Sequence, residues 1–121
     1  MKRKIYNELM KWKKESDGRT GLLIEGARRV GKSYIVEEFA KNNYKSYILI
    51  NFSKSSSEIK NLFYEYLDNL DYLFTYLSGY FGVQLYERET LFIFDEVQFC
   101  PRAREAIKYL VEDHRYDYIE T

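Results

Sequence analysis

The chain lacks several features that would assign it to a specialised class of protein. Its single cysteine, Cys100, excludes an internal disulfide and is typical of a reducing compartment. No internal repeat and no low-complexity linker is present. No apolar run approaches the roughly 20 residues that cross a bilayer, and the charged amino terminus has no small-residue cleavage site. We therefore expect a cytoplasmic protein without a membrane partner.

Net charge is also absent, because nineteen basic residues balance nineteen acidic ones. A balanced chain has no overall electrostatic footprint for nucleic acid or for a membrane surface. The basic run 2–4, with Lys11, Lys13 and Lys14 nearby, is either an edge that contacts phosphate or the solvated face of a helix. We favour the solvated face, since most charge runs have that role.

Apolar residues are plentiful in this chain of 121 residues, at 45% of the total, with 18% aromatic residues. A disordered chain would be poor in both, so we expect a folded core within one domain at most. The periodicity of the apolar residues alternates between strand-like and helix-like segments. This alternation predicts an α/β fold with a largely parallel sheet. In chain order the predicted elements are a helix over 4–15, a strand over 22–24, a helix that follows Gly31 and runs to 42–43, a strand over 44–52, an unbroken helix, a strand over 91–94, a helix that begins at Pro101, and a strand over 116–120. The unbroken helix has cap candidates at 55–57, holds its apolar spacing from Ile59 to Leu77 and ends at Gly79 and Gly82.

The segment between the first strand and the next helix matches the phosphate-binding pattern G-x-x-x-x-G-K-[ST]. The two glycines let successive N–H groups turn inward toward phosphate oxygens. The lysine reaches the β- and γ-phosphates, and the serine hydroxyl ligates Mg²⁺ at a helix amino terminus. Its two arginines either contact a phosphate or a neighbouring subunit, or are solvated. The motif is Gly26-Ala27-Arg28-Arg29-Val30-Gly31-Lys32-Ser33.

Two adjacent carboxylates, Asp95 and Glu96, end the apolar strand 91–94. Ligands bind at the carboxyl ends of the strands in open α/β sheets, so these acids would lie where a ligand binds. Strands often end in acids, and the motif gains weight from its spacing after Lys32. In a phosphate-binding fold, Asp95 would hold Mg²⁺ through its water shell and Glu96 would polarise the attacking water. Gln98 either orients that water or the γ-phosphate, or is a polar loop residue. Cys100 is interpreted as a packing residue, and His114, without a Cys or His companion, as a helix C-terminal cap.

Four groups of residues carry a family resemblance: the motif 26–33, Phe94-Asp95-Glu96-Val97-Gln98 with Pro101 shortly after it, Ala106-Ile107-Lys108-Tyr109-Leu110, and Tyr118-Ile119-Glu120-Thr121. With these residues the chain resembles a family of bacterial and archaeal AAA-type ATPases, predicted ATP-binding proteins in which the nucleotide-binding domain precedes a C-terminal domain of unknown function. The resemblance covers nearly the whole chain. It implies ATP and Mg²⁺ as ligands and an AAA-type sheet, with the strand that ends at Thr121 lying between the first and third strands.

Family members continue past the equivalent of Thr121 into a Gly-Ser segment with a γ-phosphate sensor, and then to a further strand and a candidate arginine finger. We therefore expect residues 1–121 to be the N-terminal part of an AAA-type ATP-binding domain that stops after the fourth strand. Hydrolysis by this part should be slow or absent without the finger. Thr121 is itself a candidate sensor, and Ile5 and Tyr6 are candidates for adenine packing.

The leading interpretation of function is ATP binding with weak or latent Mg-dependent ATPase activity, which drives a conformational switch. Self-association or a protein partner would use that switch. An alternative is a nucleic-acid-associated ATPase whose DNA-binding part lies in another domain. A kinase is a third possibility, but no lid segment or acceptor site is evident. The chain lacks the Asn/Thr-Lys-x-Asp guanine signature, which favours ATP over GTP.

Overall fold

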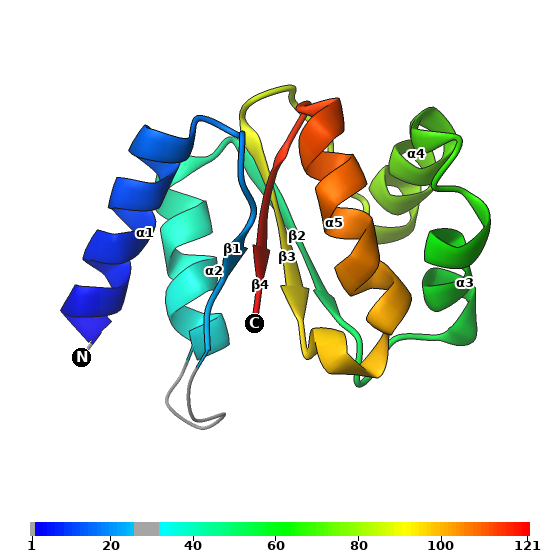
Figure 1. Cartoon of the computed structure of the whole chain (residues 1–121), viewed down its shortest axis with the longest axis horizontal. Helices are drawn as coiled ribbons and strands as arrows, with labels where there is room; N and C mark the ends of the chain where they lie inside the picture. Colours follow the sequence, from blue (N-terminus) through cyan, green and yellow to red (C-terminus); the bar gives the residue numbers. More distant parts are fainter. Residues whose placement is uncertain (1, 26–31) are drawn as a thin grey trace.

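The computed structural model describes residues 2–25 and 32–121, and these fold as one parallel sheet with helices on both faces (Figure 1). The predicted α/β class is therefore confirmed, with the sheet flanked by helices. The strands are β1 Leu22–Leu23, β2 Ser46–Asn51, β3 Thr90–Asp95 and β4 Asp117–Glu120, and the helices are α1 Lys2–Ser16, α2 Lys32–Asn43, α3 Ser57–Glu65, α4 Leu70–Phe81, the short 3₁₀ helix η1 Val97–Phe99 and α5 Pro101–Asp113.

The strand order is β1-β4-β3-β2, so the last strand in the chain lies between the first and the third. β4 pairs in parallel with β1 through Leu22 and Ile119, and with β3 through Phe92 and Tyr118. This position of β4 is the one that the family resemblance implied, and it is confirmed. Because all the pairings are parallel, the carboxyl ends of β1, β4 and β3 lie at one edge of the sheet.

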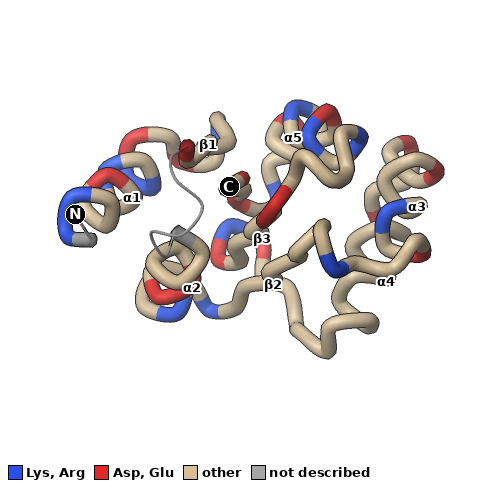
Figure 2. Tube along the Cα trace, turned by 90° about the horizontal axis from the view of Figure 1, so that it is seen from below, with Lys and Arg blue, Asp and Glu red and all other residues tan. Residues whose placement is uncertain are grey.

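β3 is buried along its whole length because helices cover both of its faces. Alternate side chains of a strand point to opposite faces, and Leu91 and Ile93 pack with α1 and α2 while Phe92 and Phe94 pack with α3, α4 and α5. Figure 2 shows the two helical layers on either side of the strands. This arrangement explains the unbroken apolar run that predicted a strand in the sheet interior.

The prediction of one unbroken helix between the cap at 55–57 and Gly82 is wrong, because the chain forms α3 and α4 with a break between them, although Gly82 does end α4. Asn69 begins α4 as its N-cap, and its Oδ1 accepts a hydrogen bond from the backbone N–H of Tyr72 at 3.2 Å. Tyr66 ends α3. Tyr66, Leu67 and Leu70 all pack against the core, so the apolar periodicity continues across the break and conceals it. The Asn side chain competes with helical hydrogen bonding and favours the cap.

The other predicted helix ends are confirmed. Ser56 caps α3, with its side chain accepting from the N–H of Ile59 at 3.3 Å. Pro101 lies in the first turn of α5, where its missing N–H costs no hydrogen bond. His114 ends α5 in the left-handed conformation, at φ 69°, and its N–H donates to Leu110 O at 3.3 Å. Cys100 is buried in the core, as the packing interpretation predicted.

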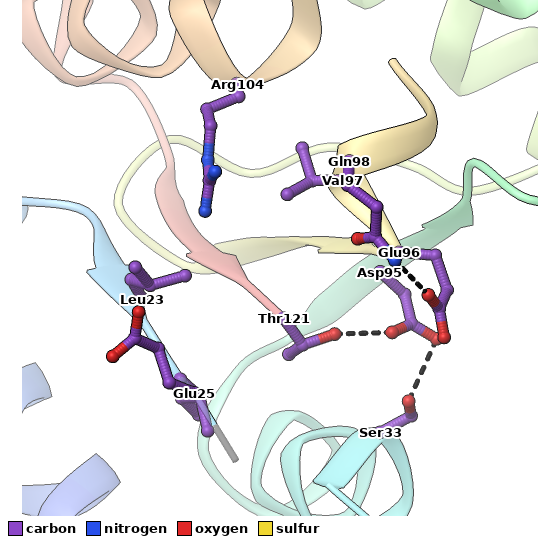
Figure 3. Close-up of a pocket in the computed structure, with 10 residues that line it drawn as sticks. Leu23, Glu25, Ser33, Asp95, Glu96, Val97, Gln98, Arg104 and Thr121 are labelled. Carbon is purple, nitrogen blue, oxygen red and sulfur yellow. Dashed lines mark hydrogen bonds between the residues drawn. The ribbon is translucent and has the colours of Figure 1, made fainter. Parts of the chain in front are cut away.

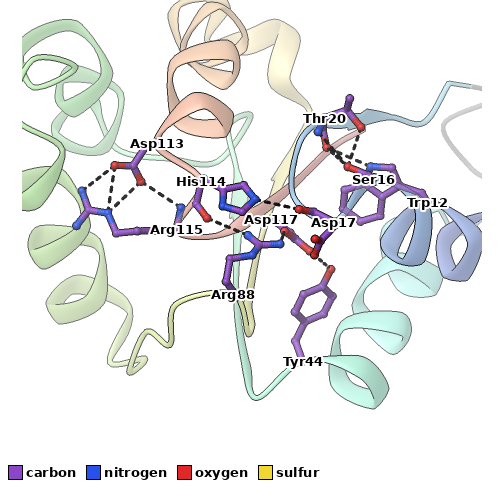
Figure 4. A network of polar contacts seen from close by, with 10 residues as sticks. All are labelled: Trp12, Ser16, Asp17, Thr20, Tyr44, Arg88, Asp113, His114, Arg115 and Asp117. Atoms are coloured by element: carbon purple, nitrogen blue, oxygen red, sulfur yellow. Dashed lines mark hydrogen bonds and ion pairs between the residues drawn. The ribbon is translucent and has the colours of Figure 1, made fainter.

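An ion pair with a buried carboxylate joins the amino ends of the strands, at the edge opposite the carboxyl ends (Figure 4). Asp117, at the start of β4, is only 4% exposed and accepts from Arg88 Nη2 at 2.6 Å and from the Tyr44 hydroxyl at 2.5 Å. Arg88 also donates to the carbonyl of His114. Burial and the hydrogen bond to Asp117 raise the pKa of Tyr44 well above its ordinary value. The Tyr44 hydroxyl therefore remains a protonated donor that secures the buried carboxylate.

Candidate functional site

A cavity of about 260 Å³ lies at the carboxyl ends of β1, β3 and β4, beside the first turn of α2 (Figure 3). Such a position at the edge of a parallel sheet is where open α/β proteins bind ligands. Its lining combines carboxylates, hydroxyls, one amide and one guanidinium with a few apolar side chains. The described residues that line it are Leu23, Ile24, Glu25, Ser33, Asp95, Glu96, Val97, Gln98, Arg104 and Thr121.

Asp95 is the centre of the polar contacts in this cavity. It is the last residue of β3, only 8% exposed, and its Oδ2 accepts a hydrogen bond from Ser33 Oγ at 2.9 Å. Its other oxygen, Oδ1, accepts from the hydroxyl of Thr121. Both oxygens of a buried carboxylate are thus satisfied by hydroxyl donors, as burial requires. Residues from α2, β3 and the end of β4 meet at one side chain.

The sheet register places Thr121 beside Asp95. Phe94 of β3 is paired with Glu120 of β4, and the chain continues by one residue on each strand. The N–H of Thr121 donates to Phe94 O at 2.9 Å, and the N–H of Val97 donates to Thr121 O. Thr121 is therefore held on both sides by the backbone around Asp95, and its hydroxyl meets the carboxylate.

Glu96 has an uncommon backbone conformation. Its φ of 54° and ψ of 46° lie in the left-handed region, which a residue with a Cβ adopts at a cost. This conformation turns the chain sharply from β3 into η1 and lets both acids line the same cavity. Gln98 Nε2 then donates to Glu96 Oε1 at 2.7 Å, which orients the carboxylate. Strained residues of this kind are common at functional sites.

Of the predicted site residues, the structure brings Ser33, Asp95, Glu96 and Gln98 into one cavity. Lys32 is the first residue of α2, and Ser33 in the same turn lines the cavity, so the amino end of α2 lies beside it. The segment 26–31 of the predicted phosphate-binding loop, including Arg28 and Arg29, lies outside the described residues.

The adenine candidates lie on α1, away from these acids. Tyr6 lines a separate cavity of about 420 Å³ between α1 and α2, together with Tyr34, Ile35 and others, whereas Ile5 is not among its lining residues. The Tyr6 hydroxyl accepts hydrogen bonds from Asn42 and Asn43 of α2, at 3.1 and 3.2 Å. Tyr6 thus has a structural role in fastening α1 to α2, and its role toward a base stays a prediction.

Sequence reasoning missed Glu25 and Arg104 as cavity residues. Glu25 follows β1 by two residues and precedes the phosphate-binding motif, so its position at a strand end was a usable signal. Arg104 comes from the first turns of α5, where a charged residue in an amphipathic helix resembles any solvated one. Only the packing of α5 beside β4 brings it to the cavity.

The donor set at Asp95 suits a hard cation such as Mg²⁺. Magnesium prefers oxygen ligands, keeps several waters, and is usually held by one or two protein groups together with substrate phosphates. A carboxylate and a hydroxyl within 2.9 Å of each other provide those protein groups. Among residues 2–25 and 32–121, no cluster of three or more His, Cys, Asp or Glu side chains forms a complete protein site for a metal.

The comparison with known families agrees with the geometry. The model of the AAA domain family matches residues 18–121, a range that extends from before β1 to the end of β4. No curated protein and no solved structure matches the chain. Within the part that the structure describes, no helix is both long enough and apolar enough to span a bilayer. Since the family match covers most of the sequence, the chain belongs to the AAA domain family, a family of nucleotide-binding ATPases.

Proposed function

We propose that the chain binds ATP with Mg²⁺ and hydrolyses it slowly, and that the bound nucleotide acts as a conformational switch. The observation that carries this proposal is the hydrogen bond between Ser33 Oγ and Asp95 Oδ2 at 2.9 Å. These side chains are far apart in the sequence, and each ends or begins an element at the same edge of the sheet. A hydroxyl and a carboxylate in this arrangement are the protein ligands that Mg²⁺-nucleotide sites use.

The phosphate-binding motif would hold the nucleotide through its backbone and its lysine. Gly26, Ala27, Arg28, Arg29, Val30 and Gly31 would direct N–H groups at the phosphate oxygens, and Lys32 would place its ammonium on the β- and γ-phosphates. Ser33 and Asp95 would hold Mg²⁺, which neutralises the charge that develops on the transferred phosphoryl group.

Glu96 would act as the general base. A carboxylate at the cavity wall can accept a proton from water as that water attacks the γ-phosphate. Gln98, which donates to Glu96 Oε1 at 2.7 Å, would fix the position of this carboxylate as a positioning residue. The left-handed backbone at Glu96 supports this role, since strain of this type is retained where a side chain must point in a defined direction.

Thr121 would act as the sensor that converts occupancy into movement. Its hydroxyl donates to Asp95, and its backbone is hydrogen bonded to Phe94 of β3 and to Val97 of η1. A ligand that draws Asp95 toward a cation would change the Thr121 contact and thereby the end of β4. We further propose that this switch serves a longer protein with a C-terminal domain of unknown function, through self-association or a protein partner.

The first test is the thermal midpoint of unfolding with and without Mg-ATP, for the parent chain and for Lys32→Ala. Ligand at 100 times its dissociation constant should stabilise the fold by about 2.7 kcal/mol, which corresponds to several degrees for a domain of this size. We expect that shift in the parent and in a control, Lys14→Ala, which removes an exposed lysine of α1. An equal shift in Lys32→Ala would contradict the proposed phosphate-binding loop.

A second candidate, a nucleic-acid-associated ATPase, is favoured by one observation. Arg3, Lys4, Lys11 and Lys14 are all exposed on α1, so this helix presents a basic face. Phosphate contacts by such a face would give an affinity for duplex DNA that falls steeply with salt. Fluorescence anisotropy of labelled duplex DNA over a salt series would measure it. Binding that is lost in a Lys11→Glu, Lys14→Glu variant would support this candidate, and absence of binding at low salt would exclude it for this domain.

A further inference from the structure

The cavity at the carboxyl ends of the strands has an unbalanced lining. Its described residues include three carboxylates, on Glu25, Asp95 and Glu96, and one cationic side chain, Arg104. A nucleotide triphosphate brings several further negative charges into this space. Phosphate groups close to carboxylates are stable only where cations and donors compensate them. Arg104 is the described cation in position to do so.

Arg104 is oriented by a single contact that leaves most of its donors available. Its Nε donates to Glu120 Oε1 at 3.2 Å, and its side chain is 51% exposed whereas that of Glu120 is 14% exposed. Among the described residues, neither terminal nitrogen of Arg104 has a hydrogen-bond partner. Figure 3 shows the side chain extending from α5 toward the end of β4. A carboxylate at Nε fixes the plane of the guanidinium and leaves its two Nη groups as a fork.

This fork is the form in which arginine recognises phosphate, because its parallel N–H groups match two phosphate oxygens. The residues that line the cavity together with Arg104 indicate which phosphate it would meet. Glu96, Gln98 and Arg104 all line the cavity, and all three come from the segment that runs from the end of β3 through η1 into α5. The phosphate nearest the base is the one under attack, which is the γ-phosphate in ATP hydrolysis.

We propose that Arg104 binds the γ-phosphate of ATP through its Nη groups and that Glu120 is the positioning residue that orients it. This inference rests on the proposed ATP site and adds to it a residue that distinguishes ATP from ADP. Glu120 directly precedes Thr121, so the same strand end holds both the orienting carboxylate and the hydroxyl on Asp95. Binding or loss of the γ-phosphate would thus change two contacts at the carboxyl end of β4, that of Glu120 with Arg104 and that of Thr121 with Asp95.

The test measures the affinities of the parent chain and of Arg104→Ala for Mg-ATP and Mg-ADP by isothermal titration calorimetry. Loss of a charge-assisted contact should weaken ATP binding roughly 10- to 100-fold. ADP, which lacks the γ-phosphate, should lose less than about threefold, so the ratio of the ATP and ADP affinities falls. Glu120→Gln keeps the arginine but loosens its orientation, and should give a smaller fall in that ratio.

The matched control is Arg102→Ala, two residues away on the same helix. Arg102 pairs with Glu105 and donates to Phe63 O, and it does not line the cavity. Arg102→Ala should leave the ratio of the ATP and ADP affinities unchanged. Thermal midpoints of unfolding, measured without nucleotide, report any purely structural effect of each variant. If Arg104→Ala does not fold, Arg104→Lys is the variant to test. Lysine keeps a cation but lacks the two Nη groups, so it should lower the ratio of the ATP and ADP affinities several-fold.

The outcomes separate this inference from the proposed function. A parent chain that binds ATP and ADP, with the same ratio of affinities in Arg104→Ala or Arg104→Lys, would overturn the role of Arg104 and leave the ATP site standing. An equal loss of both nucleotides would do the same, because it would show a structural ion pair between α5 and β4. A folded parent that binds neither nucleotide would overturn the proposed function itself.

Discussion

The buried carboxylate of Asp95 illustrates how a single side chain organises the candidate site. Its two oxygens accept hydroxyl protons from Ser33 and Thr121, and the adjacent Glu96 is held by Gln98 instead. Two neighbouring acids therefore have separate partners and separate environments, one 8% exposed and the other partly exposed. Such a division gives the two acids separate contacts, which suits the separate roles proposed for them.

The change Glu96→Gln should separate nucleotide binding from hydrolysis. The amide keeps the size of the side chain and its contact with Gln98, but it cannot accept the proton of the attacking water. We expect phosphate release to fall by roughly 10²- to 10⁴-fold, the usual contribution of a general base, while the affinity for Mg-ATP changes little.

A phosphate-release assay, together with calorimetric titration of ATP, measures both quantities for Glu96→Gln. The control is Glu105→Gln, which alters an exposed acid on α5 and should retain the parent rate. Hydrolysis by Glu96→Gln at the rate of the parent would assign the base to another group.

The roles predicted for the site residues stay predictions. The convergence of Ser33, Asp95 and Glu96 in one cavity could be inferred from the sequence, because Ser33 lies in the first turn of a helix and the two acids lie at the end of a strand. Arg104 could not, because its place at the cavity depends on how α5 packs against β4, and a single sequence does not record the packing angle of a helix.

At the scale of elements, the α3–α4 segment shows how a capping residue overrides a continuous apolar pattern. Leu62, Phe63, Leu73 and Phe74 are all buried, and their spacing would suit one long helix. The break arises from Asn69, whose side chain accepts from the Tyr72 N–H and starts a new helix. The sequence contained this signal, but apolar periodicity alone carries no information about caps.

The change Asn69→Ala should therefore destabilise the domain by about 1 kcal/mol, the typical cost of losing an N-cap side chain. Asn61→Ala, an exposed asparagine within α3, provides the matched control, since alanine there favours the helix and should be neutral or slightly stabilising. Urea denaturation gives the free energy of unfolding for each variant. Equal values for the two variants would show that Asn69 does not cap α4.

At the scale of the whole molecule, the carboxyl ends and the amino ends of the strands carry different groups of side chains. The carboxyl ends of the strands carry the cavity, and the amino ends carry the ion pair of Asp117 and Arg88 with the Tyr44 hydroxyl. The strand order came from the family resemblance, since the residues alone predicted a parallel sheet without fixing which strands are neighbours.

Stability should fall in alkaline solution because of the buried hydroxyls. Burial and the hydrogen bond to Asp117 raise the pKa of Tyr44, and burial raises that of Tyr118, above the ordinary value of 10.0. As the pH rises above about 10, the unfolded chain releases these protons while the folded chain retains them. The unfolded state then binds fewer protons, so the free energy of unfolding decreases with rising pH.

Urea denaturation from pH 8 upward, compared between the parent and Tyr44→Phe, would measure this dependence. The variant has one fewer hydroxyl to titrate, so its slope above about pH 10 should be shallower even if its stability near neutrality is lower. Tyr109→Phe, at an exposed position on α5, is the control for the substitution itself. Parallel slopes in the parent and in Tyr44→Phe would argue against a role for the Tyr44 hydroxyl.

The place of β4 in the sheet has a consequence for how the molecule is made. β1, an early segment, gains its strand partner only from β4, which the ribosome releases after every other described element. During synthesis the chain can form β2, β3 and their covering helices, but the segment that leads into the phosphate-binding motif has no neighbour to pair with. Long-range pairing of this kind is slow and cooperative. The proposed nucleotide site should thus mature later than the part of the sheet that β2 and β3 form, and nascent chains should become competent to bind nucleotide only once β4 has emerged.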